Sequence, residues 1–318
     1  MLWDAVRTKV DERGLPGQFI LTGSNAIDDS RIHHSGTGRI SRMEMLPMSL
    51  WEYGESNGSV SLMEMFDNPQ EEIFATSELK MEEIIFAACR GGWPATLNLG
   101  DDKSKLLVAK EYVKSVYKND ISRIDGVKRN QKLAHLIMKS YARNISTLAK
   151  TTSILADVTA ADDVECTRPT LESYIEALEK LFVIQDIEAW CPSIRSKTTI
   201  QSRSKRAFCD PSVAVASLNL SPESLKTQLR TFGFIFEQMC ARDLRVYSAS
   251  HDSRLSYYRD RYGLEADLVL HLDDGRYALI ECKLGSSEIE EGAKHLLEIK
   301  RLIHHLAFLM KALKYLNH

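Results

Sequence analysis

A chain of 318 residues exceeds the length at which one hydrophobic core stops growing, so we expect two or three domains. Its apolar fraction of 44% and charged fraction of 27% are typical of a soluble globular protein. The net charge of −3 neither favours nor excludes a polyanionic partner, because it conceals an acidic stretch and a separate basic one.

The cysteines are scattered without a C-x-x-C pair or regular spacing. This distribution predicts reduced thiols and favours neither a disulfide framework nor a zinc site. No apolar run reaches transmembrane length, and the charged amphipathic pattern of residues 1–14 is not that of a signal peptide. The sequence therefore predicts a cytoplasmic protein that has no membrane partner.

The N-terminal residues combine a helical pattern with a strand pattern. Leu2, Val6 and Val10 lie at helical spacing, and Gly14 ends the pattern. Residues 18–25, QFILTGSN, are typical of a short strand with a polar tip. A helix followed by a strand predicts an α/β unit whose tip lies at the carboxyl end of a parallel strand, where such folds bind ligands.

The next segment carries weaker patterns and leads into a helical region. Residues 39–54 favour a strand followed by a short helix, and the acidic stretch to about Ser77 favours a surface segment. Successive helical patterns with short loops then predict a bundle-like middle region. These patterns cover residues 80–92, 104–124, 130–146 and 146–158.

A helix predicted at residues 167–182 is followed by two strand patterns. Its apolar stripe includes Leu171, Tyr174 and Leu178, with Pro169 in the first turn. The strands are predicted at residues 183–190 and 205–216. Helix, turn, helix and a two-stranded wing predict a winged-helix module.

A basic segment connects the two predicted strands of the wing. It favours contact with the phosphates of nucleic acid, and a solvated surface is the alternative of equal weight. The preceding helix favours DNA contact less, because Glu172, Glu176 and Glu179 make its outer face acidic. The candidate nucleic-acid-binding residues of the segment are Arg195, Lys197, Arg203, Lys205 and Arg206.

The C-terminal region begins with a long helical pattern at residues 221–248. Glu237 lies close to its apolar stripe, where the carboxylate can reach a site on the following strands as a ligand or a base. Pairing of Glu237 with Arg242 or Arg245 is the alternative, and the sequence does not favour one over the other.

Residues 265–283, EADLVLHLDDGRYALIECK, predict a β-hairpin that turns at residues 274–275. Strand alternation places Glu281 and Lys283 on one face, and pairing of the two strands brings Asp267 within their reach. Two carboxylates and an amine are therefore expected to meet at one face of the sheet.

Such a cluster suits metal-assisted hydrolysis of a phosphodiester. Mg²⁺ takes oxygen ligands from one or two carboxylates and lowers the pKa of a bound water, and Asp267 and Glu281 are the candidate ligands. Lys283 can orient that water or stabilise the charge that develops on phosphorus. A satisfied salt bridge on a half-solvated sheet is the alternative, and spacing alone favours it.

The order of several segments resembles a widespread family of prokaryotic ATP-binding proteins. They are QFILTGSN, TGRISRMEMLPMSLWE, LEKLFVIQDIEAW, FGFIFEQMCARDL and EADLVLHLDDGRYALIECKLG. In this family an AAA-type ATPase domain precedes a domain of unknown function whose end is similar to PD-(D/E)xK nucleases. The resemblance covers nearly the whole chain and implies an α/β fold with an incomplete P-loop-type parallel-sheet unit, a helical and winged-helix middle, and a nuclease-like end.

The resemblance implies three domains and a catalytic site in the last one. The domains are a partial ATPase core at residues 1–78, a helical lid and winged-helix-like region at 79–210, and a PD-(D/E)xK nuclease-like domain at 211–318. The positions that match the acidic and E-x-K residues of the nuclease motif are Glu237, Asp267, Glu281 and Lys283. The resemblance also leads us to expect that the sheet lacks the strand that follows the last helix in relatives.

For the ATPase end, the resemblance implies an ATP site that this chain does not complete. Phosphoryl transfer in this class needs a G-K-[ST] loop and an acidic strand end for Mg²⁺, and neither occurs in the sequence. Thr22 or Ser24 matches the nucleotide-sensor position, and Arg39 matches the G-R that follows it. We therefore expect that Met1 falls inside the ATPase domain and that the chain does not hydrolyse ATP alone.

Three functions remain open from the sequence. The first is a Mg²⁺-dependent nuclease-like enzyme that acts on nucleic acid, with ATP as a cofactor only of full-length relatives. The second is a non-catalytic module that binds DNA or protein, and the third is an inactive remnant of an ATPase. Self-association is also left open, because ATPases of this class often assemble.

Overall fold

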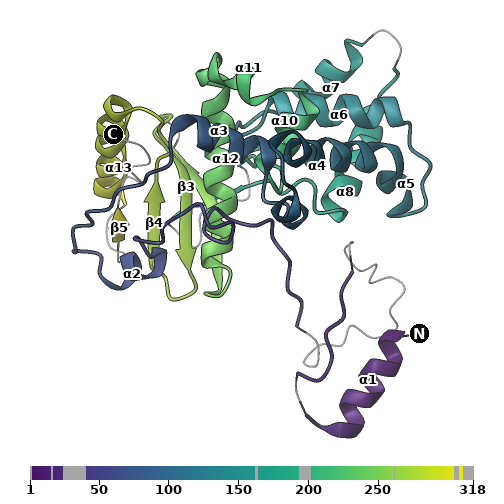
Figure 1. Cartoon of the computed structure of the whole chain (residues 1–318), viewed down its shortest axis with the longest axis horizontal. Helices are drawn as coiled ribbons and strands as arrows, with labels where there is room; N and C mark the ends of the chain where they lie inside the picture. The colour runs from purple at the N-terminus through teal and green to yellow at the C-terminus, as the bar shows by residue number, and fades with distance from the viewer. Residues whose placement is uncertain are drawn as a thin grey trace.

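The computed structural model describes residues 2–15, 17–23, 41–161, 164–192, 202–260, 262–303 and 308–310. In this part of the chain a helical body and a five-stranded sheet lie side by side, and the long helix α12 (Leu229–Ser248) runs between them (Figure 1). The N-terminal helix α1 (Leu2–Arg13) lies apart from both (Figure 1). No helix within these ranges is long and apolar enough to cross a bilayer. The architecture is mixed α/β, as the sequence predicts.

The helical body contains the helices that the sequence predicts between residues 80 and 182. Side-chain caps fix where two of them begin: Asp101 accepts the backbone N–H of Ser104 at 2.9 Å, and Asn130 accepts that of Lys132 at 2.8 Å. The elements are α3 (Met81–Arg90), the 3₁₀ helix η2 (Pro94–Asn98), α4 (Asp102–Ser115), the π-helix η3 (Val116–Asp120), α5 (Ile121–Arg123), α6 (Gln131–Arg143), α7 (Thr151–Thr159), α8 (Arg168–Lys180) and α10 (Pro211–Ser217).

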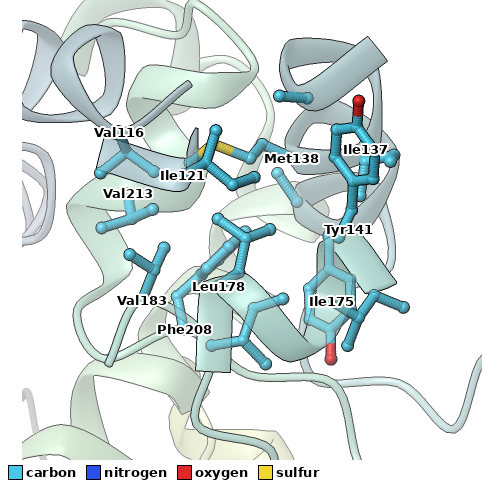
Figure 2. Packing of buried hydrophobic residues seen from close by; sticks show 14 of the residues in the cluster. Val116, Ile121, Ile137, Met138, Tyr141, Ile175, Leu178, Val183, Phe208 and Val213 are labelled. Carbon is cyan, nitrogen blue, oxygen red and sulfur yellow. The ribbon is translucent and has the colours of Figure 1, made fainter. Parts of the chain in front are cut away.

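One apolar core holds the helical body together. Tyr141 of α6, Leu178 of α8 and Phe208 are fully buried in it, and the ring centres of Tyr141 and Phe208 lie 5.4 Å apart (Figure 2). Leu171 and Tyr174 of α8 belong to the same cluster. The apolar stripe predicted for residues 167–182 therefore faces this core.

The sheet has the order β1-β2-β3-β4-β5, with antiparallel pairs at its centre and a parallel pair at each edge. β3 and β4 form the predicted hairpin, in which Gly275 takes the positive φ of 90° that the turn needs. The strands are β1 (Glu188–Ala189), β2 (Ser253–Arg259), β3 (Glu265–Leu272), β4 (Tyr277–Ile280) and β5 (Phe308–Met310). Because β5 pairs with β4 after the last helix, the expectation of a missing strand there is wrong.

Two helices cover opposite faces of the sheet. Side chains alternate along β3, so Leu268 and Leu270 share a cluster with α12, whereas Val269 shares one with α13 (Ser286–Leu302). Leu296 and Ile299 of α13 are fully buried in that second cluster. The short helix α11 (Pro222–Lys226) leads into α12. This packing places the hairpin between α12 and α13.

The N-terminal α/β unit predicted from the sequence does not form within the described residues. Residues 17–23 and 41–54 contain no strand, so the strand predictions at 18–25 and in 39–54 are wrong in their described parts. A short apolar run becomes a stable strand only where other strands or a helix cover it. Ile20 and Met43 have no such cover, since their side chains are 90% and 92% exposed.

The segment before α3 packs onto the C-terminal half of the chain. The backbone N–H of Leu50 donates to Asp243 Oδ2 of α12 at 3.3 Å. The sequence did not predict the short helix α2 (Leu62–Asp67), which buries Met65 and Phe66 in the cluster beneath the sheet. Part of the segment that the sequence assigned to an ATPase core therefore lies against the sheet and α12.

The predicted wing forms only in part. Antiparallel bridges pair Ile184 with Phe208 and Ile187 with Lys205. Beyond them, β1 leaves the wing and pairs in parallel with β2 of the sheet. The two strands of the wing are therefore short and end inside the fold.

The second predicted strand of the wing becomes a helix after residue 210. Pro211 occupies the first helical position, and Asp210 accepts the backbone N–H of Ser212 at 2.9 Å. These are the residues that start a helix, and they outweigh the strand preference of the two valines that follow. The strand prediction for residues 205–216 is wrong for its second half.

Candidate functional site

The β-hairpin brings three of the predicted site residues together. Asp267 lies on β3, and Glu281 and Lys283 follow directly after β4. The Lys283 Nζ atom lies 2.8 Å from Glu281 Oε1 and 3.8 Å from Asp267 Oδ2. We call this group of two carboxylates and one ammonium the hairpin site (Asp267, Glu281 and Lys283).

The side chain of Asp267 shapes the backbone of the hairpin site. The last pair in the antiparallel register of β3 and β4 is Leu268 with Ile280, and Asp267 and Glu281 are the next residues beyond it. Asp267 Oδ2 accepts the backbone N–H of Cys282 at 2.8 Å, and the backbone N–H of Asp267 donates to Glu281 Oε2 at 3.4 Å. These contacts replace the strand ladder, so β4 ends before Glu281 and Lys283, which the sequence placed on the strand.

Lys205 joins Glu237 of α12 to the hairpin site. Its Nζ atom lies 2.8 Å from Glu237 Oε1 and 3.1 Å from Glu265 Oε1, and it donates to the backbone carbonyl of Asp267 at 3.0 Å. The Lys205 side chain is only 1% exposed. Glu237 therefore reaches the hairpin site through a buried cation and not by direct contact. The sequence did not indicate Lys205 or Glu265 as members of this site.

The arginines that the sequence offered as partners of Glu237 bind other groups. Arg242 pairs with Asp210 at 3.0 Å and with Asp243 at 2.7 Å. Arg245 donates to the side-chain oxygen of Gln185 at 3.0 Å.

Burial and neighbouring charges shift the pKa values in the site. Burial raises the pKa of Glu281, the Asp267 carboxylate raises it further, and Lys283 opposes both. Burial by itself lowers the pKa of Lys283, but the carboxylates of Asp267 and Glu281 outweigh it, so the net shift is upward. Burial also raises the pKa of Glu237, and the neighbouring Lys205 ammonium opposes that rise. Lys283 is therefore cationic at neutral pH.

The hairpin site is partly open to solvent. The side chain of Lys283 is 30% exposed, against 14% for Asp267 and 8% for Glu281. Lys283 is therefore the most exposed of the three side chains.

The donor set fits a hydrated Mg²⁺ ion and not a closed metal cage. Among the described residues, no group of three or more His, Cys, Asp and Glu side chains is arranged to hold a metal ion. Mg²⁺, however, binds through one or two carboxylates and keeps several waters. Asp267 and Glu281 supply two carboxylates of this kind, whereas Glu237 and Glu265 are bound to Lys205.

Gly292 of α13 makes room for the side chain of Glu281. A Cβ atom at this position would lie 2.8 Å from Glu281 Cγ and 3.7 Å from Lys283 Cε. The first distance is shorter than a carbon–carbon contact allows. The absence of a side chain at Gly292 therefore lets Glu281 lie where Asp267 and Lys283 meet it. A glycine inside a helical pattern is the sequence signal that could have found this residue.

The predicted nucleic-acid-binding segment divides into an exposed and a buried part. Arg195 and Lys197 lie outside the described residues, and Arg203 is exposed. Lys205 is buried among carboxylates, and Arg206 is 13% exposed and pairs with Asp186 at 2.8 Å. The last two side chains are therefore not on the surface where the sequence placed them, because the bridges of the wing carry them into the fold.

Little of the predicted nucleotide-sensor site lies in the described residues. Thr22 is exposed and belongs to no helix or strand. Ser24 and Arg39 lie outside the described residues. Thr22 therefore does not stand at the end of a strand, which is the place that a sensor residue occupies.

Two regions of the chain match known domain models. Residues 81–224 match a domain of unknown function, DUF8612, and residues 232–315 match another, DUF4143. The hairpin site and Glu237 fall in the second region, whereas Lys205 falls in the first. No curated protein and no solved structure matches the chain.

Proposed function

We propose that the hairpin site hydrolyses phosphodiester bonds of nucleic acid with the help of Mg²⁺. One observation carries the proposal: the Lys283 ammonium lies 2.8 Å from the Glu281 carboxylate and 3.8 Å from that of Asp267 in a partly open site. Two carboxylates beside a cation are the groups that metal-assisted attack on phosphorus needs.

Each residue of the hairpin site has a part in this reaction. Asp267 and Glu281 would hold the ion, which supplies a bound water with a lowered pKa. Lys283 donates hydrogen bonds to a non-bridging phosphate oxygen and stabilises the negative charge that develops there. The contact of 2.8 Å with Glu281 orients Lys283, and the hydrogen bond to Cys282 orients the Asp267 carboxylate.

The DUF4143 match supports a wider proposal. Such domains are common in AAA-ATPase-associated proteins, and the order of motifs in the chain resembles AAA-type ATP-binding proteins that end in a PD-(D/E)xK-like domain. We propose that the hairpin site works in a protein of that kind. We assign ATP hydrolysis to no residue of this sequence, because the sequence contains no G-K-[ST] motif.

A non-catalytic module that binds DNA or protein is the second candidate. The buried Lys205 favours it, because an ammonium paired with Glu237 and Glu265 already neutralises part of the acidic cluster without a metal ion. In that case the cluster would stabilise the packing of the sheet on α12, and binding would involve no chemistry.

Cleavage of supercoiled plasmid and of labelled oligonucleotides, with Mg²⁺ or Mn²⁺ and with EDTA, separates the two candidates. We expect the wild type to cleave in a metal-dependent way and Glu281→Gln and Lys283→Met to lose on the order of 10²-fold or more in rate. Glu298→Gln, an exposed carboxylate on the same helix as Gly292, serves as the control and should cleave like the wild type. If neither the wild type nor the two site variants cleave nucleic acid, the result would favour the binding module.

A further inference from the structure

Lys205 enters the site from outside the hairpin and its two covering helices. Its backbone exchanges hydrogen bonds of 2.8 and 2.9 Å with Ile187 in the wing. Its Nζ atom lies 5.5 Å from the centre of the Tyr257 ring on β2. The backbone of Lys205 is therefore fixed in the wing, and its ammonium group lies next to the sheet.

Three oxygen atoms lie close to the ammonium group of Lys205. An ammonium has three hydrogens to donate, and three oxygen atoms lie around it: Glu237 Oε1 at 2.8 Å, Glu265 Oε1 at 3.1 Å and the Asp267 carbonyl at 3.0 Å. The second carboxylate oxygen of Glu265 pairs with Arg259 at 3.2 Å. Both Glu237 and Glu265 are thus already paired with protein cations.

We propose that the positive charge of Lys205 limits the hairpin site to a single divalent ion. Its ammonium group pairs with the carboxylates of Glu237 and Glu265, so that Asp267 and Glu281 are the carboxylates that bind the metal. A second divalent ion would have to share the same oxygens and would be repelled by the ammonium at close range. Lys205 also holds the backbone of Asp267, so it is a positioning residue for the ligand that remains.

This inference rests on the proposed function, because it assumes that Asp267 and Glu281 hold Mg²⁺. The test is a titration of the full chain with Mn²⁺, followed by electron paramagnetic resonance of the free ion and by calorimetry. We expect the wild type to bind about one Mn²⁺ per chain, and Lys205→Ala, which frees the oxygens around the ammonium position, to bind about two. Lys205→Arg keeps a cation at that position and should bind about one.

The possible results distinguish the role of Lys205 from the proposed function of the site. If the wild type and Lys205→Ala both bind about one ion, the role proposed for Lys205 is wrong, but the metal site is supported. A wild type that binds two ions would overturn the role of Lys205 as well. A wild type that binds none would overturn the proposed function itself, and the inference with it.

A second variant keeps the inference testable if Lys205→Ala does not fold. Glu237→Gln retains an oxygen that accepts from Lys205 but removes the carboxylate charge. Because Lys205 and not the metal is the partner of Glu237, we expect this variant to bind about one Mn²⁺ with a Kd within about threefold of the wild type. Loss of Mn²⁺ binding in a folded Glu237→Gln chain would show that Glu237 is a metal ligand and would overturn the inference.

Discussion

The carboxylate of Asp267 accepts the backbone N–H of Cys282 across the open end of the hairpin, at 2.8 Å. This single hydrogen bond takes the place of the next rung of the strand ladder and ends β4. Cys282 lies between Glu281 and Lys283 in the chain, so the same bond fixes the backbone from which both side chains reach toward Asp267. The hydrogen bond between Asp267 and Cys282 therefore accounts both for the end of β4 and for the arrangement of the candidate site.

Substitutions at Asp267 should separate its structural role from its chemical role. Asp267→Asn keeps an oxygen for the Cys282 N–H, so we expect its free energy of unfolding to stay within about 1 kcal/mol of the wild type. Asp267→Ala leaves that N–H unsatisfied and should cost about 1–3 kcal/mol. Both variants should lose metal-dependent cleavage. Urea unfolding followed by tryptophan fluorescence, together with the plasmid assay, checks this, and an Asn variant that cleaves at the wild-type rate would contradict it.

Gly292→Ala should damage the hairpin site without unfolding the protein. The new methyl group would lie 2.8 Å from Glu281 Cγ, so the Glu281 side chain must leave its present position beside Lys283. We expect a loss of cleavage of about tenfold or more and unchanged secondary structure by circular dichroism.

Gly233→Ala is the matched control for this change. Gly233 also lies inside a helix, α12, but a Cβ atom there meets nothing within 4 Å. The substitution should raise the free energy of unfolding by up to about 1 kcal/mol through helix propensity and leave cleavage unaltered. Equal activity of the two alanine variants would show that Glu281 needs no such space.

Arg242→Met should be strongly destabilising. The Arg242 side chain is 2% exposed and pairs with Asp210 and Asp243, so its removal leaves two buried carboxylates without their cation. We expect a loss of about 3–5 kcal/mol in the free energy of unfolding. Arg168→Met is the control, because its pair with Glu172 is exposed and should cost about 0.5 kcal/mol or less. Urea midpoints that fall equally in both variants would contradict the prediction.

The stability of the sheet should fall in mild acid because of His271. Burial lowers the pKa of His271 below its usual 6.5, Arg254 on the neighbouring strand lowers it further, and Asp273 opposes both. The folded state therefore favours the neutral imidazole, so the stabilisation is present above pH 6.5 and is lost as the pH falls through the lowered folded pKa.

His271→Gln removes this titration and should flatten the acid side of the stability profile. The measurement is the urea midpoint at several pH values on either side of 6.5 for the wild type, His271→Gln and His251→Gln. His251 is exposed, and its variant is the control that should follow the wild type. A His271→Gln variant with the acid sensitivity of the wild type would assign that sensitivity to other groups.

Arg203→Ala should weaken binding of the chain to duplex DNA. Arg203 is the exposed member of the basic segment among the described residues, since Lys205 and Arg206 are turned inward. We expect the slope of log affinity against log salt to fall by about 1 for one lost phosphate contact. Fluorescence anisotropy over a range of salt concentrations measures it, with the exposed Arg123→Ala of α5 as the control. Identical salt slopes for the wild type and Arg203→Ala would show that Arg203 is a solvated surface residue that does not contact DNA phosphates.

The N-terminal region shows where sequence patterns lead to a wrong structure. Residues 18–25 have the composition of a strand, yet residues 17–23 contain none, and Ile20 is 90% exposed. A strand needs partners that pair and pack with it, and composition does not say whether they are present. The opposite error occurs at α2. The acidic composition of this stretch predicted a surface segment, but the structure has a helix there, whose Met65 and Phe66 pack beneath the sheet.

The sequence by itself determined the features that depend on neighbours along the chain. Helical periodicity predicted the helices of the body, and the Asp-Gly pair at residues 274–275 predicted the hairpin. Once the hairpin is given, its register brings Asp267 and Glu281 together, because they are only 14 residues apart and each adjoins one member of the Leu268–Ile280 pair.

Only the tertiary structure decided the place of Lys205. It stands in a run of basic residues, which is the pattern of a solvated surface, yet its side chain is 1% exposed. Its partners Glu237 and Asp267 lie 32 and 62 residues further along the chain. Whether a cation is buried depends on which elements pack around it and which carboxylates they carry, and no local pattern contains that information.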